Sequence, residues 1–368
     1  RKIKVLHILT GGLRIEGIAS TQIMFFQNID MEKFQIDVAA VHNNSQEMIS
    51  EYEKAGCNVI VFPDRTDETV KYFFALLKYL KKIKYDIIHI HGSSALMSVE
   101  LLAAKIAGIP IRIAHSRNTK ADNVRADKLL RPLFNWSYTD GVACGEDAGK
   151  WLFGKKKFIV LHNGKDFSKF CFDSKLREEE RNKYNFNGKI VIGHVGAFNY
   201  QKNHEYLVRV FAEYLKKNDN AILYLIGDGS VRSAVLKKAK ELKIDNKIIF
   251  AGNVRDVPQR LQAMDIMAFP SRFEGLPNVV LEWQAEGLPC LISDKITKEC
   301  APSDLVEFAS IEADPKYWAD KIDYMLEKFT DREAQARRAT QALKENGFDI
   351  VDATKQLENM YLKLMKYI

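Results

Sequence analysis

Cysteine is scarce in this sequence and never occurs in a pattern that would pair it. The five cysteines are scattered, odd in number and never spaced as C-x-x-C: they are Cys57, Cys144, Cys171, Cys290 and Cys300. This usage argues against a disulfide framework and against a cysteine metal site. It is typical of a reducing compartment, so we expect a cytoplasmic protein.

Long hydrophobic runs are missing as well. No stretch of eighteen or more apolar residues occurs, so no transmembrane helix is predicted. The opening residues, RKIKVLHILTGG, begin with a basic pair, but their apolar run is short and no small-residue cleavage site follows. We therefore interpret residues 3–9 as a first β-strand rather than as part of a signal peptide.

Two ligand-binding motifs are also absent. The first predicted strand ends in Thr10-Gly11-Gly12, which is not G-x-G-x-x-G, so the nicotinamide dinucleotide fingerprint is missing where it should be strongest. No Asp-x-Asp stands near a predicted strand end, which argues against a catalytic metal ion.

The sequence has no large excess of either charge, except in one segment. The formal net charge is +7, and residues 105–165 alone hold 12 basic against 5 acidic residues. Aromatic residues are interspersed with these charges, namely Phe134, Trp136, Trp151 and Phe153. Such a surface suits an anionic membrane, a pyrophosphate-bearing acceptor or nucleic acid. The alternative is a solvated helix face whose aromatics point into the core.

Strand-like apolar runs alternate with amphipathic helical patterns along the whole chain. This alternation predicts βαβ units and parallel sheets that are buried on both faces. At 368 residues the chain is too long for one ordinary domain, so we expect an α/β protein with two Rossmann-like, doubly wound domains. Thirteen strands are predicted, at residues 3–9, 35–42, 58–63, 86–92, 111–116, 141–145, 158–164, 189–196, 221–229, 247–252, 266–271, 289–294 and 306–310.

One predicted strand-to-helix loop carries a lysine. A strand ends at Gly196, a polar loop follows, and Lys202 stands just before the next helix. A lysine beside the free N–H groups of a helix start is suited to clamp a phosphate. The alternative is an exposed surface lysine, which is the commonest setting of this residue type.

A second loop, in PSRFEGLPNVVLEWQAEGLPCLISD, carries two glutamates. Glu274 precedes a Gly-Leu-Pro break, and Glu282 lies in the apolar helix that follows, with Pro277 expected in its first turn. The helix start favours an anion, and carboxylates accept hydrogen bonds from paired sugar hydroxyls. A sugar nucleotide presents hydroxyls, a diphosphate and hydroxyls in that order, and this loop could bind all three.

These motifs together resemble the family-4 retaining glycosyltransferases, in the branch that assembles capsular and exopolysaccharides. The resemblance rests on EGLPNVVLE, GHVGAFNYQKNH, AGNVRDVPQRLQAMDIMAFPS, VLHNGKDFSKF and GLPCLISD, and it covers nearly the whole chain in the same order. It implies the GT-B fold, in which two Rossmann-like domains face each other across a cleft and the last helix crosses back to the N-terminal domain. We therefore expect an acceptor-binding domain of residues 1–164 plus 352–368 and a nucleotide-sugar-binding domain of residues 165–351.

The resemblance also implies roles for individual residues. It assigns the donor sugar hydroxyls to Glu274, the diphosphate to Lys202 and the transferred sugar to His115. It assigns the ribose hydroxyls to Glu282 and the surroundings of the base to Val254 and Arg255. The remaining donor contacts fall on strand-end loops and helix starts, at Gly11, Gly12, Gly196, Gly275, Leu276, Pro277 and Asn278.

The sequence departs from the family pattern at two places. The family has an arginine directly after Gly196 where this chain has Ala197, and its first loop reads Gly-Gly-x-Glu-Thr where this chain has Glu16-Gly17-Ile18-Ala19-Ser20. One positive charge and one loop carboxylate are therefore absent. This leaves three possibilities open: weaker donor binding, substitution by another basic residue, or a changed function.

The implied function is transfer of a hexose or N-acetylhexosamine, with retention and without metal, from a nucleotide sugar to a glycan hydroxyl. The resemblance implies a UDP-sugar as donor substrate, no further cofactor and a lipid-linked oligosaccharide as acceptor. We expect no nucleic-acid partner, and peripheral contact with the inner face of the membrane through residues 105–165. Two alternatives stay open: a sugar-nucleotide epimerase of the same fold, and a non-catalytic basic adaptor.

Overall fold

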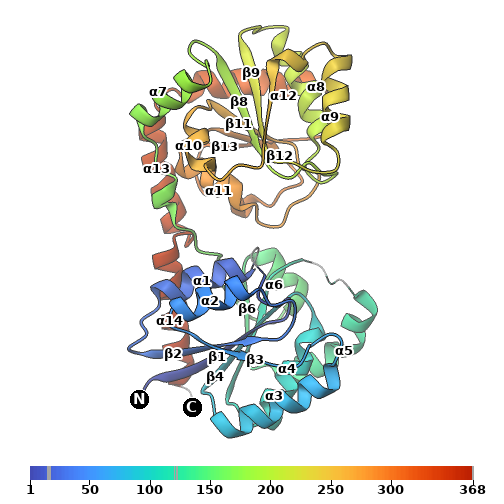
Figure 1. The fold of residues 1–368 in the computed structure, drawn as a ribbon, viewed down its shortest axis with the longest axis vertical. Coiled ribbons are helices and arrows are strands. Elements are labelled where there is room, and N and C mark those ends of the chain that lie inside the picture. The colour runs from blue at the N-terminus through green and yellow to red at the C-terminus, as the bar shows by residue number, and fades with distance from the viewer. Residues whose placement is uncertain (15–17, 120, 122, 367–368) are drawn as a thin grey trace. The chain divides into compact units, whose positions relative to one another are not determined.

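The computed structural model describes residues 1–14, 18–119, 121 and 123–366. The chain divides into two compact units (Figure 1). Unit 1 comprises Arg1–Asp166 and Gly347–Ile368, and unit 2 comprises Phe167–Asn346. In the part of the chain that is described, no helix is both long and apolar enough to span a bilayer.

Unit 1 is built on a 7-stranded parallel sheet with the order β3-β2-β1-β4-β5-β6-β7. The central strands are buried on both faces, as expected for parallel strands between helical layers. The strands are β1 (Ile3–Leu9), β2 (Phe34–Ala40), β3 (Asn58–Val61), β4 (Ile87–Gly92), β5 (Ile111–Ser116), β6 (Asp140–Ala143) and β7 (Ile159–Val160).

Helices cover both faces of this sheet (Figure 1). One hydrophobic layer packs α1, α2 and α14 on the strands, and a second layer packs α3, α4 and α6 on the opposite face. In α3, Tyr72, Leu76 and Leu80 recur every four residues, which gives the helix one buried side. The helices are α1 (Ile18–Asn28), α2 (Gln46–Lys54), α3 (Thr69–Ile83), α4 (Ser98–Ile106), α5 (Val124–Ser137), α6 (Glu146–Phe153) and α14 (Ile350–Met365), with 3₁₀ turns η1 (Ala95–Met97) and η2 (Phe167–Lys169), the latter opening unit 2.

The last helix, α14, returns to unit 1 after the chain has passed through unit 2. Asp349 caps it by accepting from the Val351 and Asp352 N–H groups. Its Glu358 carboxylate accepts from the Asp30 N–H at 2.7 Å, and Tyr361 is fully buried against the sheet. The expected crossing back of the C-terminal helix is therefore confirmed.

Unit 2 repeats the scheme with a 6-stranded parallel sheet in the order β10-β9-β8-β11-β12-β13. Its strands are β8 (Ile190–Val195), β9 (Ala221–Ile226), β10 (Ile248–Gly252), β11 (Ile266–Phe269), β12 (Cys290–Ser293) and β13 (Val306–Ala309). Its helices are α7 (Ser174–Lys183), α8 (His204–Leu215), α9 (Arg232–Glu241), α10 (Val257–Gln262), α11 (Asn278–Ala285), α12 (Pro315–Lys328) and α13 (Arg332–Glu345), with 3₁₀ turns η3 (Asp245–Lys247) and η4 (Lys298–Cys300).

The predicted fold class is confirmed, and each of the thirteen predicted strands matches a strand among the described residues. In both sheets the strand order reverses next to the first strand, between β1 and β4 in unit 1 and between β8 and β11 in unit 2. Ligands of doubly wound sheets bind beyond the carboxyl ends of the strands at such a reversal. The two reversals are therefore where the predicted site residues should be sought.

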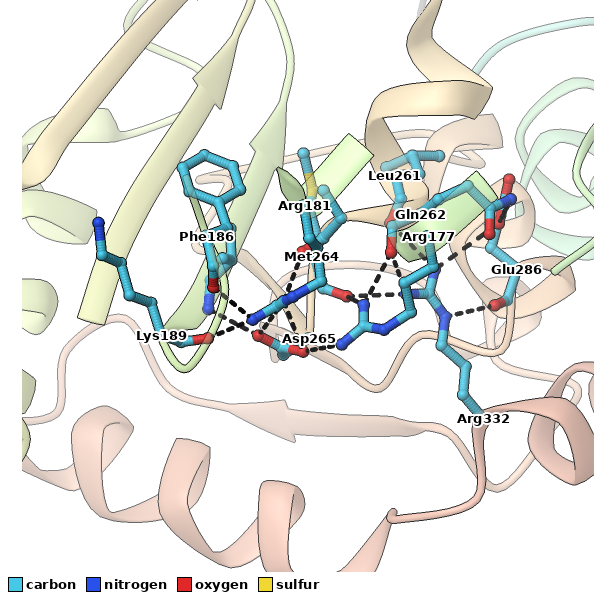
Figure 2. A network of polar contacts seen from close by, with 12 residues as sticks. Arg177, Arg181, Phe186, Lys189, Leu261, Gln262, Met264, Asp265, Glu286 and Arg332 are labelled. Carbon is cyan, nitrogen blue, oxygen red and sulfur yellow. Dashed lines mark hydrogen bonds and ion pairs between the residues drawn. The ribbon is translucent and has the colours of Figure 1, made fainter. Parts of the chain in front are cut away.

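An arginine cluster fixes the opposite, amino edge of the unit 2 sheet (Figure 2). Arg332, at the start of α13, donates to the carbonyl oxygens of Leu261, Gln262, Met264 and Glu286 at 2.8–2.9 Å. These carbonyls lie at or just beyond the ends of α10 and α11, where helices leave their last C=O groups without partners. The C-terminal end of α11 is thereby anchored, while its N-terminal end faces the carboxyl edge of the sheet.

Candidate functional site

The strand reversal in unit 2 brings a lysine and a glutamate into an ion pair. Lys202 ends the loop after β8, Glu274 lies in the loop after β11, and Lys202 Nζ is 2.6 Å from Glu274 Oε1. The side chains are 16% and 9% exposed, so the pair is largely screened from water. Lys202 Nζ also lies 4.6 Å from the centre of the Phe269 ring. Lys202 is thus not the ordinary exposed lysine of the alternative interpretation.

Glycines shape the loop that holds this lysine. A Cβ atom at Gly196 would lie 3.2 Å from Lys202 Cε and 3.2 Å from His194 Nε2, so a side chain there would crowd the lysine. A Cβ atom at Gly227 would lie 2.1 Å from the Gly196 carbonyl oxygen. The loops after β8 and β9 therefore touch each other through their backbones.

Helix α11 carries the second predicted glutamate. The helix begins at Asn278, so Pro277 is its N-cap residue and not, as expected, a member of its first turn. No side chain caps this helix start, which suits an incoming anion. Glu282 is half-buried, whereas Val280, Leu281 and Trp283 are fully buried on the same helix.

The other predicted contacts of unit 2 lie on strand-end loops at the same edge. Gly275 is exposed and has open space where a Cβ atom would be, while Leu276 and Asn278 are half-buried. Val254 and Arg255 follow the end of β10, two strands away from β8, and Arg255 is exposed.

Sequence reasoning missed a buried histidine beside this loop. His194, near the end of β8, donates from Nδ1 to the Ala268 carbonyl oxygen at 2.9 Å, and its Nε2 is buried without a partner in the structure. Burial lowers the pKa of His194 to about 4, so the ring is neutral and Nε2 carries a lone pair. The sequence signal was present, since the histidine stands two residues before Gly196.

In unit 1, the two predicted glycines, Gly11 and Gly12, differ in their surroundings. Gly12 has φ +81°, and a Cβ atom there would lie 1.6 Å from the His42 carbonyl oxygen, so glycine is needed for the close approach of its own chain. Gly11 is exposed with open space around it, and it lines a cavity of about 240 Å³ with Thr10, Ser93 and Ser94. Glu16 and Gly17, where the first loop departs from the family pattern, lie outside the described residues.

The predicted sugar contact, His115, is one of four buried histidines on a single face of the unit 1 sheet. In the sheet register His7 of β1 pairs with His89 of β4, and His91 of β4 pairs with His115 of β5. Each is at most 1% exposed. Only His115 was singled out from the sequence, although histidines two residues apart in a buried strand were a visible signal.

Burial keeps these four imidazoles neutral. Burial and the nearby charge of Arg117 lower the pKa of His7 to about 3. The same causes hold the pKa values of His89, His91 and His115 well below their ordinary range, with the neighbouring imidazoles contributing.

Three of these histidines lie close enough together to bind one metal ion. The ring nitrogens of His7, His89 and His91 lie within 4.8 Å of one another. However, His91 Nδ1 already accepts hydrogen bonds from the Arg117 guanidinium, at 2.9 and 3.2 Å. A neighbouring cation and an occupied lone pair both disfavour a metal ion, so the residues fit a hydrogen-bonded cluster better than a metal centre.

The basic segment 105–165 divides its aromatic side chains between core and surface. Phe134 and Phe153 are buried, as the solvated-face interpretation requires, whereas Trp136 is 61% exposed. Leu129, also on α5, is 80% exposed. Lys105 Nζ lies 3.3 Å from the centre of the Trp136 ring. On α5 itself, the exposed Leu129 and Trp136 share the surface with the exposed Lys128.

Comparisons with known proteins find matches in both units of the chain. Residues 176–342 match the family model for glycosyl transferases group 1, and residues 21–139 match that for glycosyl transferase 4-like proteins. The glycosyltransferase EpsF of Bacillus subtilis (strain 168) is 30% identical over 87% of this chain and 86% of its own length. The UDP-Gal:alpha-D-GlcNAc-diphosphoundecaprenol alpha-1,3-galactosyltransferase of Escherichia coli is 24% identical over 99% of this chain and 98% of its own.

A solved structure shares the fold over nearly the whole chain. HepE of Anabaena, crystallised in complex with UDP, superposes with a TM-score of 0.80 at 17% identity and covers 98% of this chain and 100% of its own. At this identity the similarity concerns the fold.

Proposed function

The chain belongs to the group 1 glycosyltransferases, and we propose that it transfers a hexose or N-acetylhexosamine from a UDP-sugar to a hydroxyl of a lipid-linked glycan during surface polysaccharide assembly. The observation that carries the proposal is the Lys202–Glu274 ion pair at the strand reversal of unit 2. UDP is the ligand of the Anabaena structure, and the name of the Escherichia coli relative gives a UDP-sugar donor and a lipid diphosphate-linked acceptor.

The pair supplies what a sugar diphosphate needs. A bound diphosphate competes with Glu274 for the ammonium group of Lys202, which is 16% exposed and therefore poorly hydrated. The Glu274 carboxylate is then left to accept hydrogen bonds from donor sugar hydroxyls. We assign the ribose hydroxyls to Glu282, the phosphate and sugar to the backbone of Gly275–Asn278 and the region of the base to Val254 and Arg255.

We propose transfer with retention and without a metal ion. The bond between the anomeric carbon and the diphosphate oxygen breaks, and the acceptor oxygen forms its bond on the same face of the sugar. The acceptor hydroxyl proton passes to the departing diphosphate. Lys202 and the uncapped start of α11 stabilise the negative charge that develops on this leaving group. Gly11, Gly12 and His115 are assigned to the donor from unit 1.

The proposal is tested by replacing Lys202. Lys202→Ala should lower kcat/KM for sugar transfer about 10²- to 10³-fold, the range for losing one group that stabilises developing charge. The matched control is Lys216→Ala, because Lys216 forms only a surface ion pair with Glu213. Product formation from UDP-glucose, UDP-galactose and UDP-N-acetylglucosamine is followed with a lipid diphosphate-linked N-acetylglucosamine acceptor.

Three results would contradict the proposal. Equal activity of the two lysine variants would remove Lys202 from the site. Conversion of the UDP-sugar without an acceptor would favour an epimerase of the same fold. Absence of both turnover and UDP binding would leave the adaptor interpretation, with Ala197 and the changed first loop as the suspected cause.

A further inference from the structure

The buried histidines of unit 1 are joined in a chain of hydrogen bonds whose direction can be deduced. The chain starts at Arg117, directly after β5. Its guanidinium donates to His91 Nδ1 from Nη2 at 2.9 Å and from Nε at 3.2 Å, and also to Asn163 Oδ1 at 2.5 Å. Guanidinium has no acceptor, so His91 Nδ1 must be the lone-pair nitrogen. In a neutral imidazole the proton of His91 is then on Nε2.

The tautomer of His91 determines the tautomer of His7, which in turn determines whether the Tyr361 hydroxyl donates or accepts. His91 Nε2 lies 2.9 Å from His7 Nδ1, which must therefore accept, so the proton of His7 is also on Nε2. His7 Nε2 lies 3.1 Å from the hydroxyl oxygen of Tyr361, which accepts in turn. Tyr361 belongs to α14 and lies 354 positions after His7 in the sequence.

The Tyr361 hydroxyl determines the tautomers of His89 and His115. Having accepted from His7, the Tyr361 hydroxyl donates its own proton to His89 Nδ1 at 2.6 Å. His89 therefore carries its proton on Nε2, which lies 3.0 Å from His115 Nδ1. His115 Nδ1 accepts, and the proton of His115 must be on Nε2.

The chain ends on an unsatisfied donor. His115 Nε2 is buried and has no hydrogen-bond partner in the structure. Buried N–H groups without a partner are rare, and each indicates a bound water or a ligand atom that completes it. Since every other link is satisfied, this N–H group is the place where the chain offers a hydrogen bond to something else.

We propose that the chain from Arg117 through Tyr361 fixes His115 as an Nε2–H donor toward an oxygen atom of the sugar-nucleotide donor. His115 is then a hydrogen-bond donor and not a general base, because its only lone pair is occupied by His89. Tyr361 and His89 are positioning residues that act through His115. The ligand part of this inference rests on the proposed function, whereas the direction of the chain does not.

The test removes the Tyr361 hydroxyl from the chain of hydrogen bonds. Tyr361→Phe breaks the link between His7 and His89, so His89 and His115 lose the donor that sets their tautomers. Tyr52→Phe is the matched control, since Tyr52 is equally buried in the same hydrophobic layer and its hydroxyl only donates to the Ala19 carbonyl oxygen at 2.8 Å. Tyr361→Phe loses two buried hydrogen bonds, one from His7 and one to His89, whereas Tyr52→Phe loses one, so a larger fall in melting temperature is expected for Tyr361→Phe.

The first readout is the histidine tautomers, measured by nitrogen-15 NMR of the full chain with labelled histidine and assigned with a His115→Gln variant. In the unchanged protein and in Tyr52→Phe, the rings of His7, His89, His91 and His115 should all carry the proton on Nε2. In Tyr361→Phe, His89 and His115 should become tautomer mixtures while His91 is unchanged. A proton on His115 Nδ1 in the unchanged protein, or Zn²⁺ binding that displaces the ring protons, would overturn the chain.

The second readout is turnover of the UDP-sugar that supports transfer. Tyr361→Phe should lower kcat/KM about tenfold and Tyr52→Phe should leave it unchanged. Equal activity of the two variants, with the expected tautomer difference present, would mean that His115 donates to a buried water and not to the donor. If the unchanged protein turns over no UDP-sugar, the proposed function and the ligand assignment both fail. The NMR result still tests the direction of the hydrogen bonds between the histidines.

Discussion

The two units have the same sheet order around their strand reversals but offer ligands different chemistry. Unit 2 presents a charged pair, Lys202 and Glu274, on loops after β8 and β11. Unit 1 presents neutral histidines on β1, β4 and β5, joined to Arg117. The comparison shows that the sheet topology determines where a site can form, whereas a few side chains at the strand ends determine which ligand it can bind.

Each unit also supports its site from elements distant in sequence. In unit 2, Arg332 holds the end of α11 through the Glu286 carbonyl oxygen, and α11 carries Glu282, which we assign to the donor. In unit 1, Tyr361 of α14 completes the histidine chain that ends at His115. The returning C-terminal helix therefore contributes a polar group to the unit 1 cluster as well as apolar packing.

The largest expected difference between the units is their response to acid. Four histidines of unit 1 (His7, His89, His91 and His115) and two of unit 2 (His194 and His204) have pKa values below the ordinary 6.5 because they are buried. A depressed pKa means that the unfolded state binds the proton first, so stability is lost as pH falls below about 6.5. Each such histidine costs roughly 1 kcal/mol of unfolding free energy per pH unit.

Unit 1 should therefore lose about 4 kcal/mol between pH 6.5 and 5.5, against about 2 kcal/mol for unit 2. Glu286 increases the contrast, since burial raises its carboxyl pKa and so makes unit 2 gain stability as pH falls toward the unfolded value of 4.5. Scanning calorimetry at pH 7 and 5.5 measures the two transitions, and limited proteolysis between them identifies the unit that has unfolded. A larger acid loss in unit 2 would contradict the burial argument.

A smaller effect concerns membrane contact, which we propose for unit 1 alone. Leu129 is 80% exposed on α5 and lies beside the exposed Lys128, a combination suited to an anionic bilayer surface. Leu129→Glu should weaken binding to phosphatidylglycerol vesicles about tenfold, or about 1.4 kcal/mol. The control is Leu236→Glu on α9 of unit 2, which is 37% exposed. Equal effects of both variants in a flotation assay would contradict membrane contact through unit 1 alone.

Much of the fold could be predicted from the sequence, because parallel strands leave continuous apolar runs between helical patterns. The positions of the thirteen strands followed from the local pattern, and the crossing back of α14 followed from the resemblance. Pro277 was misplaced by one position, since proline fits both the N-cap and the first turn. Boundaries of this kind depend on a few backbone angles that residue type alone does not decide.

The candidate site was only partly predictable, for a physical reason. Lys202 and Glu274 were each identified, but their ion pair spans 72 positions and depends on β8 and β11 being neighbours. His115 was identified, whereas the chain behind it requires the sheet register and a tyrosine 272 positions from His89. Strand-end residues can be picked out by pattern, but their partners follow from strand order, which only the structure gives.

The assignment of the nucleotide to unit 2 can be measured most directly by hydrogen–deuterium exchange of the whole protein with and without UDP. Bound UDP should slow exchange of backbone amides in residues 196–204 and 274–282, the loop that holds Lys202 and the start of α11. The histidine strands of unit 1 should change less, because the proposed contact of His115 is with the transferred sugar, which UDP lacks. Protection confined to unit 1, with residues 196–204 and 274–282 unchanged, would contradict the account.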